Sequence, residues 1–263
     1  MKFGICTSIA NAAAVKAAGW DYVEENVQNL LQGTIPDSQW EGEHLSRQAN
    51  AGDGAPILAA CCLVPGNMKI TGPDVDVEAL RGYMGNVCAR ARKVGIQKLV
   101  FGSGAARNVP EGFDPARAKQ QIIEFAFMSA EWAAKDGLLI VAEHLNRKEC
   151  NILNTVAEAE EIVKAVGHPN FRNLVDCYHF WLEKESLADL KKRMPLIAHV
   201  HVSDLEGRRP PGETGTADFR PFFRVLKEGG YNGTISVESL GFDDIAGMGP
   251  RVLAFLKTQW SQA

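Results

Sequence analysis

Residues 138–143 read LLIVAE, a continuous apolar run that ends in a glutamate, and residues 155–166 further on read TVAEAEEIVKAV. The first stretch predicts a short strand that is buried on both faces, because its apolar residues do not alternate with polar ones. The second stretch predicts a helix, because its apolar residues recur at helical spacing. A buried strand followed by a helix is the unit from which parallel sheets are built.

The same unit recurs along the whole chain. Short strand-like runs are expected at residues 3–8, 22–27, 57–64, 98–101, 138–143, 173–176, 196–201 and 234–238. Each is followed by a stretch that favours a helix, at residues 9–18, 40–51, 77–94, 115–134, 155–166, 187–193, 219–228 and 251–259. Eight such units in 263 residues leave about 33 residues for each, which is the size of one βαβ unit.

This arithmetic predicts the α/β class and a closed (β/α)8 TIM barrel that forms a single domain over residues 1–263. A chain of this length could otherwise form two domains, but no linker or change of composition marks a boundary. An open, doubly wound sheet is the alternative architecture. It is disfavoured because no G-x-G-x-x-G motif follows the first strand.

Composition restricts the partners that the protein can have. The formal net charge is −4 and the isoelectric point is about 5.9, which argues against a nucleic-acid partner. No apolar run is long enough to span a membrane. The six cysteines contain no C-x-x-C pair, so we expect reduced thiols and a cytoplasmic protein. Assembly into a homo-oligomer stays open.

Four ligand-type residues close the last four predicted strands: Glu143, Asp176, His201 and Glu238. The carboxyl ends of barrel strands meet at one face, so these side chains should lie together. Three buried carboxylates repel one another unless a cation lies between them. Three oxygen donors and one nitrogen favour Mn²⁺, with Mg²⁺ or Co²⁺ as alternatives, and are less typical of a structural zinc. A six-coordinate ion would keep two positions for a substrate with adjacent hydroxyl and carbonyl oxygens.

Other residues near strand ends have open roles. His199 shares a face with His201 one pleat deeper, so it is expected to support the site rather than to bind the metal. Glu24 closes the second strand and is expected either to form buried hydrogen bonds or to contact substrate. Arg107 follows the fourth strand and is expected to reach a substrate anion or hydroxyl, with an ordinary βα turn as the alternative. Residues 65–73 form either a lid or a surface loop.

Four segments carry a resemblance to a known family: EHLNRKE at 143–149, DCYH at 176–179, HVHVSD at 199–204 and ISVE at 235–238. The first resembles the E-x-x-N-R-x-E segment of the ketose 3-epimerases, and the second resembles their D-x-x-H segment. The chain as a whole is similar to the xylose isomerase-like TIM-barrel superfamily of sugar isomerases and epimerases. That superfamily includes D-tagatose 3-epimerase and hydroxypyruvate isomerase.

The resemblance implies a role for each matching residue. The metal ligands would be Glu143, Asp176, His201 and Glu238. Two of them, Glu143 and Glu238, would also be the catalytic acid and base.

Substrate-orienting groups follow from the same resemblance. They would be His179, Glu149 and an arginine just after the strand that ends at His201. That arginine is Arg208 or Arg209, because the spacing differs by one from the epimerase pattern, and Arg208 is the candidate we carry forward.

These assignments predict a metal-dependent sugar isomerase or epimerase that removes a proton α to a carbonyl through a metal-stabilised enediolate. The alternative is a metal-dependent lyase on a keto-sugar or keto-glycoside, which begins with the same proton abstraction. A phosphodiesterase like endonuclease IV is disfavoured, since it would need more histidines and a basic surface. A barrel that only binds its ligand is the non-enzymatic alternative. In each enzymatic case the partner is a small-molecule sugar or sugar derivative.

Overall fold

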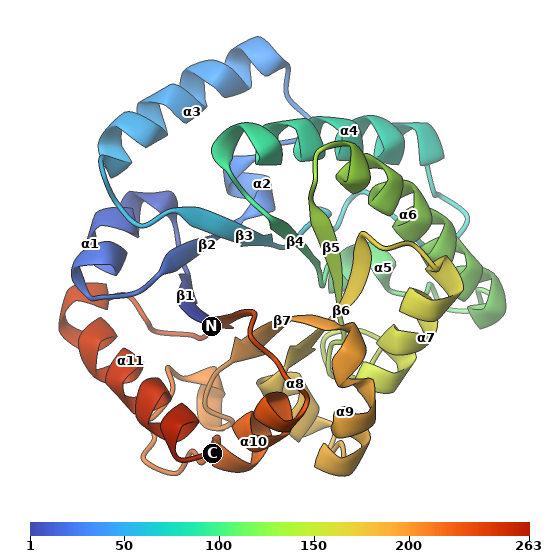
Figure 1. Ribbon diagram of the computed structural model, residues 1–263. Helices are drawn as coiled ribbons and strands as arrows, with labels where there is room; N and C mark the ends of the chain where they lie inside the picture. Colours follow the sequence, from blue (N-terminus) through green and yellow to red (C-terminus); the bar gives the residue numbers. More distant parts are fainter.

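The computed structural model describes the backbone of residues 1–263 and the side chains of all but residues 49–51. Eight parallel strands pair in chain order, and the last pairs with the first, so the sheet closes into a barrel (Figure 1). The strands are β1 (Lys2–Cys6), β2 (Tyr22–Asn26), β3 (Ile57–Cys61), β4 (Lys98–Phe101), β5 (Leu139–Glu143), β6 (Phe171–Asp176), β7 (Ile197–Val202) and β8 (Thr234–Val237). The predicted (β/α)8 barrel is confirmed.

A ring of helices surrounds this barrel (Figure 1). One main helix follows each strand: α1 (Ala12–Ala17), α3 (Asp37–Ala51), α4 (Val77–Val94), α6 (Pro115–Lys135), α7 (Val156–Val166), α9 (Leu187–Arg193), α10 (Arg220–Glu228) and α11 (Ile245–Ser261). The boundaries of α4 show how sequence sets these helices. The Asp76 side chain caps its first turn by accepting from the Ala79 N–H, and Gly95 ends it with a left-handed φ of 84°.

The structure differs from the predicted elements at some boundaries. The strand expected over 57–64 ends at Cys61, because Cys62 adopts a φ of 57° that leaves the extended region. The last helix begins at Ile245 rather than at residue 251. The sequence did not predict the short elements α2 (Val27–Leu30), α5 (Gly104–Arg107), α8 (Cys177–Leu182), η1 (Ile9–Asn11), η2 (Met194–Leu196) and η3 (Glu206–Arg208).

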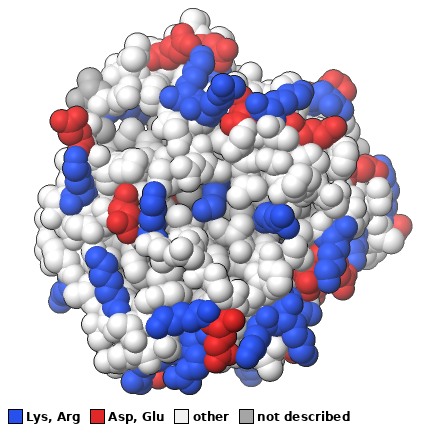
Figure 2. Space-filling model, viewed as in Figure 1, with Lys and Arg blue, Asp and Glu red and all other residues white. Residues whose placement is uncertain are grey.

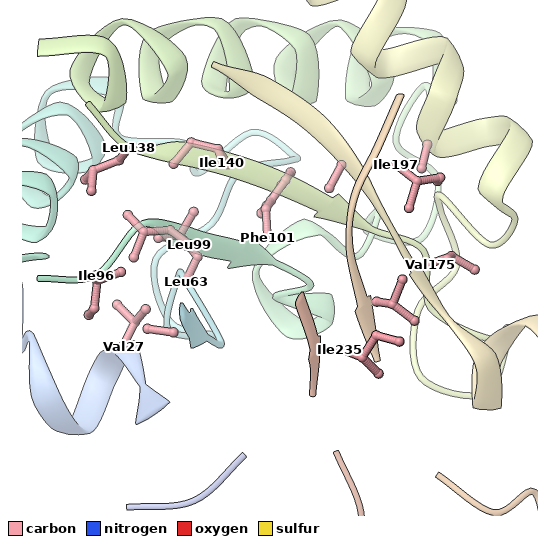
Figure 3. Packing of buried hydrophobic residues seen from close by; sticks show 14 of the residues in the cluster. Val27, Leu63, Ile96, Leu99, Phe101, Leu138, Ile140, Val175, Ile197 and Ile235 are labelled. Carbon is pink, nitrogen blue, oxygen red and sulfur yellow. The ribbon is translucent and has the colours of Figure 1, made fainter. Parts of the chain in front are cut away.

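Buried apolar side chains fill the layer between the strands and the helices. Figure 3 shows part of this layer, with Leu99, Phe101, Ile140 and Val175 among its members. Alternate residues of the same strands point the other way, into the barrel. There a smaller apolar cluster consists of Cys61, Val100, Val141 and Leu174.

Polar side chains also occupy the described barrel interior, beside a second small apolar cluster of Tyr22, Leu58 and Ala59. They include the fully buried side chains of Tyr22, Glu24, His199 and Ser236. The β7 register pairs Leu174 with His199 and Asp176 with His201, so the two histidines lie one above the other on the inner face. A buried polar layer therefore lies directly below the ends of the strands.

Charged side chains of both signs are interspersed around the edge of the face in Figure 2. On this face the described residues form no broad surface of one sign. No helix in the described part of the chain is long and apolar enough to cross a membrane.

Candidate active site

The four predicted ligand residues meet at the carboxyl ends of the last four strands. Glu143, Asp176 and His201 lie at the ends of β5, β6 and β7, and Glu238 directly follows β8. Each contributes one ligand-type atom, and these atoms all lie within 4.8 Å of one another. Glu143, Asp176 and His201 are at most 5% exposed, while the Glu238 side chain is 23% exposed. The group is therefore buried, with Glu238 nearest to solvent.

The acceptor atoms of this cluster converge on one ring nitrogen. His201 Nδ1 lies 3.1 Å from Glu143 Oε1, 3.2 Å from Glu238 Oε2 and 3.9 Å from Asp176 Oδ2. Burial lowers the pKa of His201, but the charges of Glu24 and Glu238 outweigh burial and hold that pKa well above its ordinary value. The negative charges of the carboxylates therefore favour a positive charge next to His201 Nδ1.

The two glutamates of the cluster have different environments. Burial, followed by the charge of Glu238, raises the pKa of Glu143 above its ordinary value. Burial also raises the pKa of Glu238, but the positive charges of Arg208 and His201 more than offset it, so that pKa lies below its ordinary value. Glu143, whose pKa is raised, is therefore suited to hold a proton, and Glu238, whose pKa is lowered, is suited to accept one.

Glu24 and His199 lie beneath the cluster and form buried hydrogen bonds. Glu24 Oε1 lies 2.9 Å from His201 Nε2, and Glu24 Oε2 lies 2.8 Å from His199 Nε2. Ser236 Oγ donates to Glu24 Oε2 at 2.5 Å. Of the two roles considered for Glu24, the structure shows the hydrogen-bonding one, and His199 takes the deeper position expected for it.

A cavity of about 290 Å³ opens above the cluster. Its walls include Glu143 and Glu238 together with the three predicted substrate-orienting residues Glu149, His179 and Arg208. The structure thus gathers the predicted acid–base pair and these candidates around one space.

Asn146 holds two of these residues in place. Its side-chain NH₂ group lies 2.8 Å from Glu149 Oε1 and 2.8 Å from His179 Nδ1. The other nitrogen of the fully buried His179, Nε2, has no hydrogen-bond partner among the described residues and lies 3.9 Å from Asp176 Oδ2. The quoted EHLNRKE segment contained Asn146, but sequence reasoning assigned it no role. His179 Nε2 is available to a ligand in the cavity.

The structure distinguishes between the two adjacent arginines. Arg208 turns inward, with Nη2 hydrogen-bonded to Glu238 and 3.2 Å from Asp176 Oδ2. Its guanidinium also lies 4.9 Å from the centre of the Tyr178 ring. The guanidinium of Arg209 lies instead against Gly241, whose added Cβ would come 2.1 Å from Arg209 Nη1. Arg208 is the arginine that faces the cavity.

Arg107 does not lie where the sequence suggested. We expected it to reach a substrate anion or hydroxyl, but its side chain is fully buried and is not part of the cavity wall. Its guanidinium donates to the carbonyl oxygens of Phe101 at 3.0 Å and Glu143 at 2.8 Å. Arg107 is the last residue of the short helix α5, and its side chain is directed to the backbone at the ends of β4 and β5.

The segment over residues 65–73 is joined to the α5 region. Ile70 N donates to the Ala106 carbonyl at 2.8 Å, and Thr71 Oγ1 donates to the Asn108 carbonyl at 2.7 Å. Gly66 lines the cavity. Of the lid and the surface loop considered for this segment, the structure shows neither in simple form: one residue of the segment lines the cavity, and hydrogen bonds join the segment to the α5 region.

A closed (β/α)8 barrel whose carboxyl-end face holds a buried charged cluster has the arrangement on which TIM-barrel active sites are built. A family model described as the xylose isomerase-like TIM barrel matches residues 12–258. The chain belongs to this family, as its sequence motifs suggested.

Relatives of the chain include named isomerases and epimerases. The 2-oxo-tetronate isomerase of Cupriavidus necator is 27% identical over 161 residues, which cover 60% of each chain. The 3-dehydro-D-guloside 4-epimerase of Escherichia coli is 32% identical over 128 residues, which cover 48% of each chain. The chain therefore spans no more than about three fifths of the length of these curated relatives.

The likeness to solved structures covers nearly the whole chain. A D-psicose 3-epimerase from Clostridium cellulolyticum, solved with D-tagatose, superposes with a TM-score of 0.82 over 99% of both chains. The two sequences are 18% identical, so this likeness concerns the fold.

Proposed function

We propose that this protein is a divalent-metal-dependent sugar isomerase or epimerase that removes a proton from the carbon next to a carbonyl. The observation that carries the proposal is the convergence of three carboxylates on His201 Nδ1 at the end of the barrel. The names of its relatives support the reaction class. The substrate class that fits is a small sugar or sugar derivative with adjacent hydroxyl and carbonyl groups.

The metal ligands would be Glu143, Asp176, His201 and Glu238. Their fit to a cation is supported by the demand for positive charge at His201 Nδ1 and by the raised pKa of Glu143. Three carboxylate oxygens and one imidazole nitrogen favour Mn²⁺, with Mg²⁺ or Co²⁺ as the alternatives. A bound cation of this kind supplies charge stabilisation to an oxyanion that develops on the substrate carbonyl.

Glu143 and Glu238 would move the proton. Their carboxyl groups reach the cavity from β5 and from the end of β8, and they lie 3.1 Å and 3.2 Å from His201 Nδ1. Glu238, whose pKa is held low by Arg208 and His201, is ionised and can accept a proton, whereas Glu143, whose pKa is raised, can hold one. Return of the proton to the same carbon from the opposite face gives an epimer, and return to the neighbouring carbon gives an isomer.

Three residues of the cavity wall would orient the sugar. His179 Nε2 can donate to a hydroxyl oxygen, because Nδ1 accepts from the side-chain NH₂ and the backbone N–H of Asn146 and the ring proton is therefore on Nε2. Arg208 and Glu149 face each other across the mouth, with 3.7 Å between Arg208 Nη1 and Glu149 Oε1. A charged donor and a charged acceptor at this separation suit the hydroxyl groups of a sugar.

The test is proton exchange in D₂O with Mn²⁺, read by NMR over free ketoses, sugar phosphates and keto-glycosides. With the substrate that the protein converts, Glu143→Gln and Glu238→Gln should each slow deuterium incorporation at least ~10²-fold, because each removes a proton-transferring group. Glu131→Gln, on the exposed surface of α6, should exchange like the parent protein. Normal exchange in both site variants would overturn the acid–base assignment, and loss of a substituent next to the exchanging carbon would identify a lyase instead.

A further inference from the structure

The carboxylate of Glu24 is shared between two imidazoles inside the barrel. Its Oε1 lies 2.9 Å from His201 Nε2, and its Oε2 lies 2.8 Å from His199 Nε2. Glu24, His199 and His201 are all 0% exposed, so water does not compete for these bonds. An ionised carboxylate only accepts hydrogen bonds, so both Nε2 atoms must carry a proton.

The neighbouring groups agree with this direction of donation. Ser236 Oγ donates to Glu24 Oε2, which leaves Tyr22 to donate its hydroxyl proton to Ser236 Oγ at 2.7 Å. A Cβ on Gly4 of β1 would come within 2.3 Å of the Tyr22 ring, so any larger residue at this position would clash with the ring. Ser236 therefore donates directly to the Glu24 carboxylate, and Tyr22 donates to Ser236.

The far side of His199 completes the same pattern. Lys98 Nζ donates to Thr234 Oγ1 at 2.8 Å, and Thr234 Oγ1 lies 2.7 Å from His199 Nδ1. Because Thr234 Oγ1 accepts from the lysine, its own proton is free to go to His199 Nδ1. His199 Nδ1 also lies 3.1 Å from the Thr234 carbonyl oxygen, so both oxygens of Thr234 lie against this nitrogen, while Nε2–H donates to Glu24.

We propose that Glu24 is a positioning residue that sets the tautomer and the ring orientation of His201. With Nε2–H bonded to Glu24, Nδ1 is the nitrogen that His201 would offer to a cation bound among the three carboxylates, once a cation takes the place of the Nδ1 proton. This inference rests on the proposed function, since a bare Nδ1 is useful there as a metal ligand. A carboxylate that binds the remote nitrogen of a metal-binding histidine fixes its orientation and strengthens it as a ligand.

Replacement of Glu24 by glutamine separates this role from simple space-filling. The amide has nearly the shape of the carboxylate, but one of its two ends donates instead of accepting. It can therefore satisfy only one of the two Nε2–H groups, and the other imidazole must change its tautomer or lose its bond.

The first experiment measures Mn²⁺ binding to the whole protein by isothermal titration calorimetry. Glu24→Gln should weaken Mn²⁺ binding by about 10–100-fold, the usual effect of losing such a partner. The matched control is Glu25→Gln, on the same strand, where the side chain points away from the barrel interior and accepts from the backbone N–H groups of Ile9 and Asn26. This control should bind Mn²⁺ within about 3-fold of the parent protein.

The second measurement reads the tautomer directly. In the parent protein loaded with diamagnetic Mg²⁺ and labelled with ¹⁵N-histidine, His201 should show a protonated Nε2 and a non-protonated Nδ1. Glu24→Asp keeps the charge but shortens the side chain by one methylene, so it should also weaken Mn²⁺ binding, and it serves if Glu24→Gln does not fold.

The outcomes separate this inference from the proposed function. Parent-like Mn²⁺ affinity in Glu24→Gln or in Glu24→Asp, or a proton on Nδ1 of His201 in the loaded protein, would overturn the role of Glu24. Failure of the parent protein itself to bind Mn²⁺, Mg²⁺ or Co²⁺ would overturn the metal-dependent function instead.

Discussion

Glu143 shows how much of the site depends on the space around a single carboxylate. Its side chain is 5% exposed, and a Cβ added to Gly102 on the neighbouring strand end would come 2.2 Å from Glu143 Oε2. The glycine that follows β4 is therefore a requirement of the proposed acid–base site, because any side chain there would approach the position of the carboxylate. From the sequence, Gly102 belongs either to an ordinary βα turn or to a segment whose backbone N–H groups face a substrate, and neither interpretation predicts this close approach to Glu143.

Gly102→Ala should therefore impair activity more than stability. The added methyl group must displace the Glu143 carboxylate, and a shift of about 1 Å in a catalytic group can cost ~10²-fold in rate. The measurement is kcat/KM with the substrate found in the exchange screen, together with urea unfolding. Gly82→Ala on α4, where nothing lies within 4 Å of the added Cβ, should keep full activity. Equal activity in the two variants would contradict the requirement.

The adjacent arginines offer a second test at the scale of single residues. Arg208→Ala should lower kcat/KM by about 10–100-fold, the effect of losing one or more charge-assisted hydrogen bonds. Arg209→Ala should stay within about 3-fold of the parent protein, because its guanidinium lies against Gly241 rather than in the cavity. Steady-state kinetics on both variants decide between them, and a larger effect at Arg209 would reverse the assignment.

At the scale of elements, the short helices after the strands determine where loop residues point. The helix α5 directs Arg107 under the ends of β4 and β5, where it bonds the carbonyls of Phe101 and Glu143. The backbone at the end of β5 is thereby joined to the backbone at the end of β4 through a buried guanidinium. Arg107 acts on the site through the strands and not through the substrate.

Arg107→Met should consequently destabilise the fold. The variant loses two hydrogen bonds from a buried guanidinium to carbonyl oxygens, worth about 3 kcal/mol of unfolding free energy together. Urea unfolding measures this loss, and Arg117→Met at an exposed arginine of α6 should cost less than about 1 kcal/mol. A stable Arg107→Met protein with a raised KM would instead restore the substrate-binding role.

At the scale of the whole molecule, stability depends on pH through groups outside the site. Glu185 follows α8, accepts from the Val156 N–H at 2.9 Å and lies 3.3 Å from His144 Nε2. Burial raises the pKa of Glu185 to about 7, although the hydrogen bond from Val156 opposes the rise. The folded protein therefore keeps a proton on Glu185 at pH values where the unfolded chain has lost it.

The raised pKa of Glu185 predicts the direction in which the unfolding free energy changes with pH. Between about pH 4.5 and pH 7 the folded state binds more protons at Glu185, so the contribution of this group to the unfolding free energy falls as pH rises, by up to about 3 kcal/mol. Glu185→Gln cannot ionise and should become more stable relative to the parent protein across that range. Urea unfolding at pH 5 and pH 8 measures the difference, and Glu131→Gln should run parallel to the parent protein. A constant difference between Glu185→Gln and the parent would contradict the raised pKa.

The alternation of apolar runs and helices along the sequence determined the barrel, and with it the meeting of Glu143, Asp176, His201 and Glu238. Parallel strands closed into a barrel bring their carboxyl ends to one face, and the two-residue period of a strand sets which side chains point inward. These features depend on the order of apolar and polar residues within short segments, which can be read directly from the sequence.

Only the tertiary structure decided the positions of Arg107 and Arg208, the need for glycine at 102 and the hydrogen bonds of Glu24. Arg107 and Arg208 lie in α5 and η3, helical turns within the βα connections that are too short to show a periodicity in the sequence, so their directions depend on the backbone conformation of each connection. The partners of Glu24, His199 and His201, lie more than 170 residues away in sequence. Such contacts arise only when the barrel closes, since closure brings strands from opposite ends of the chain to within hydrogen-bonding distance.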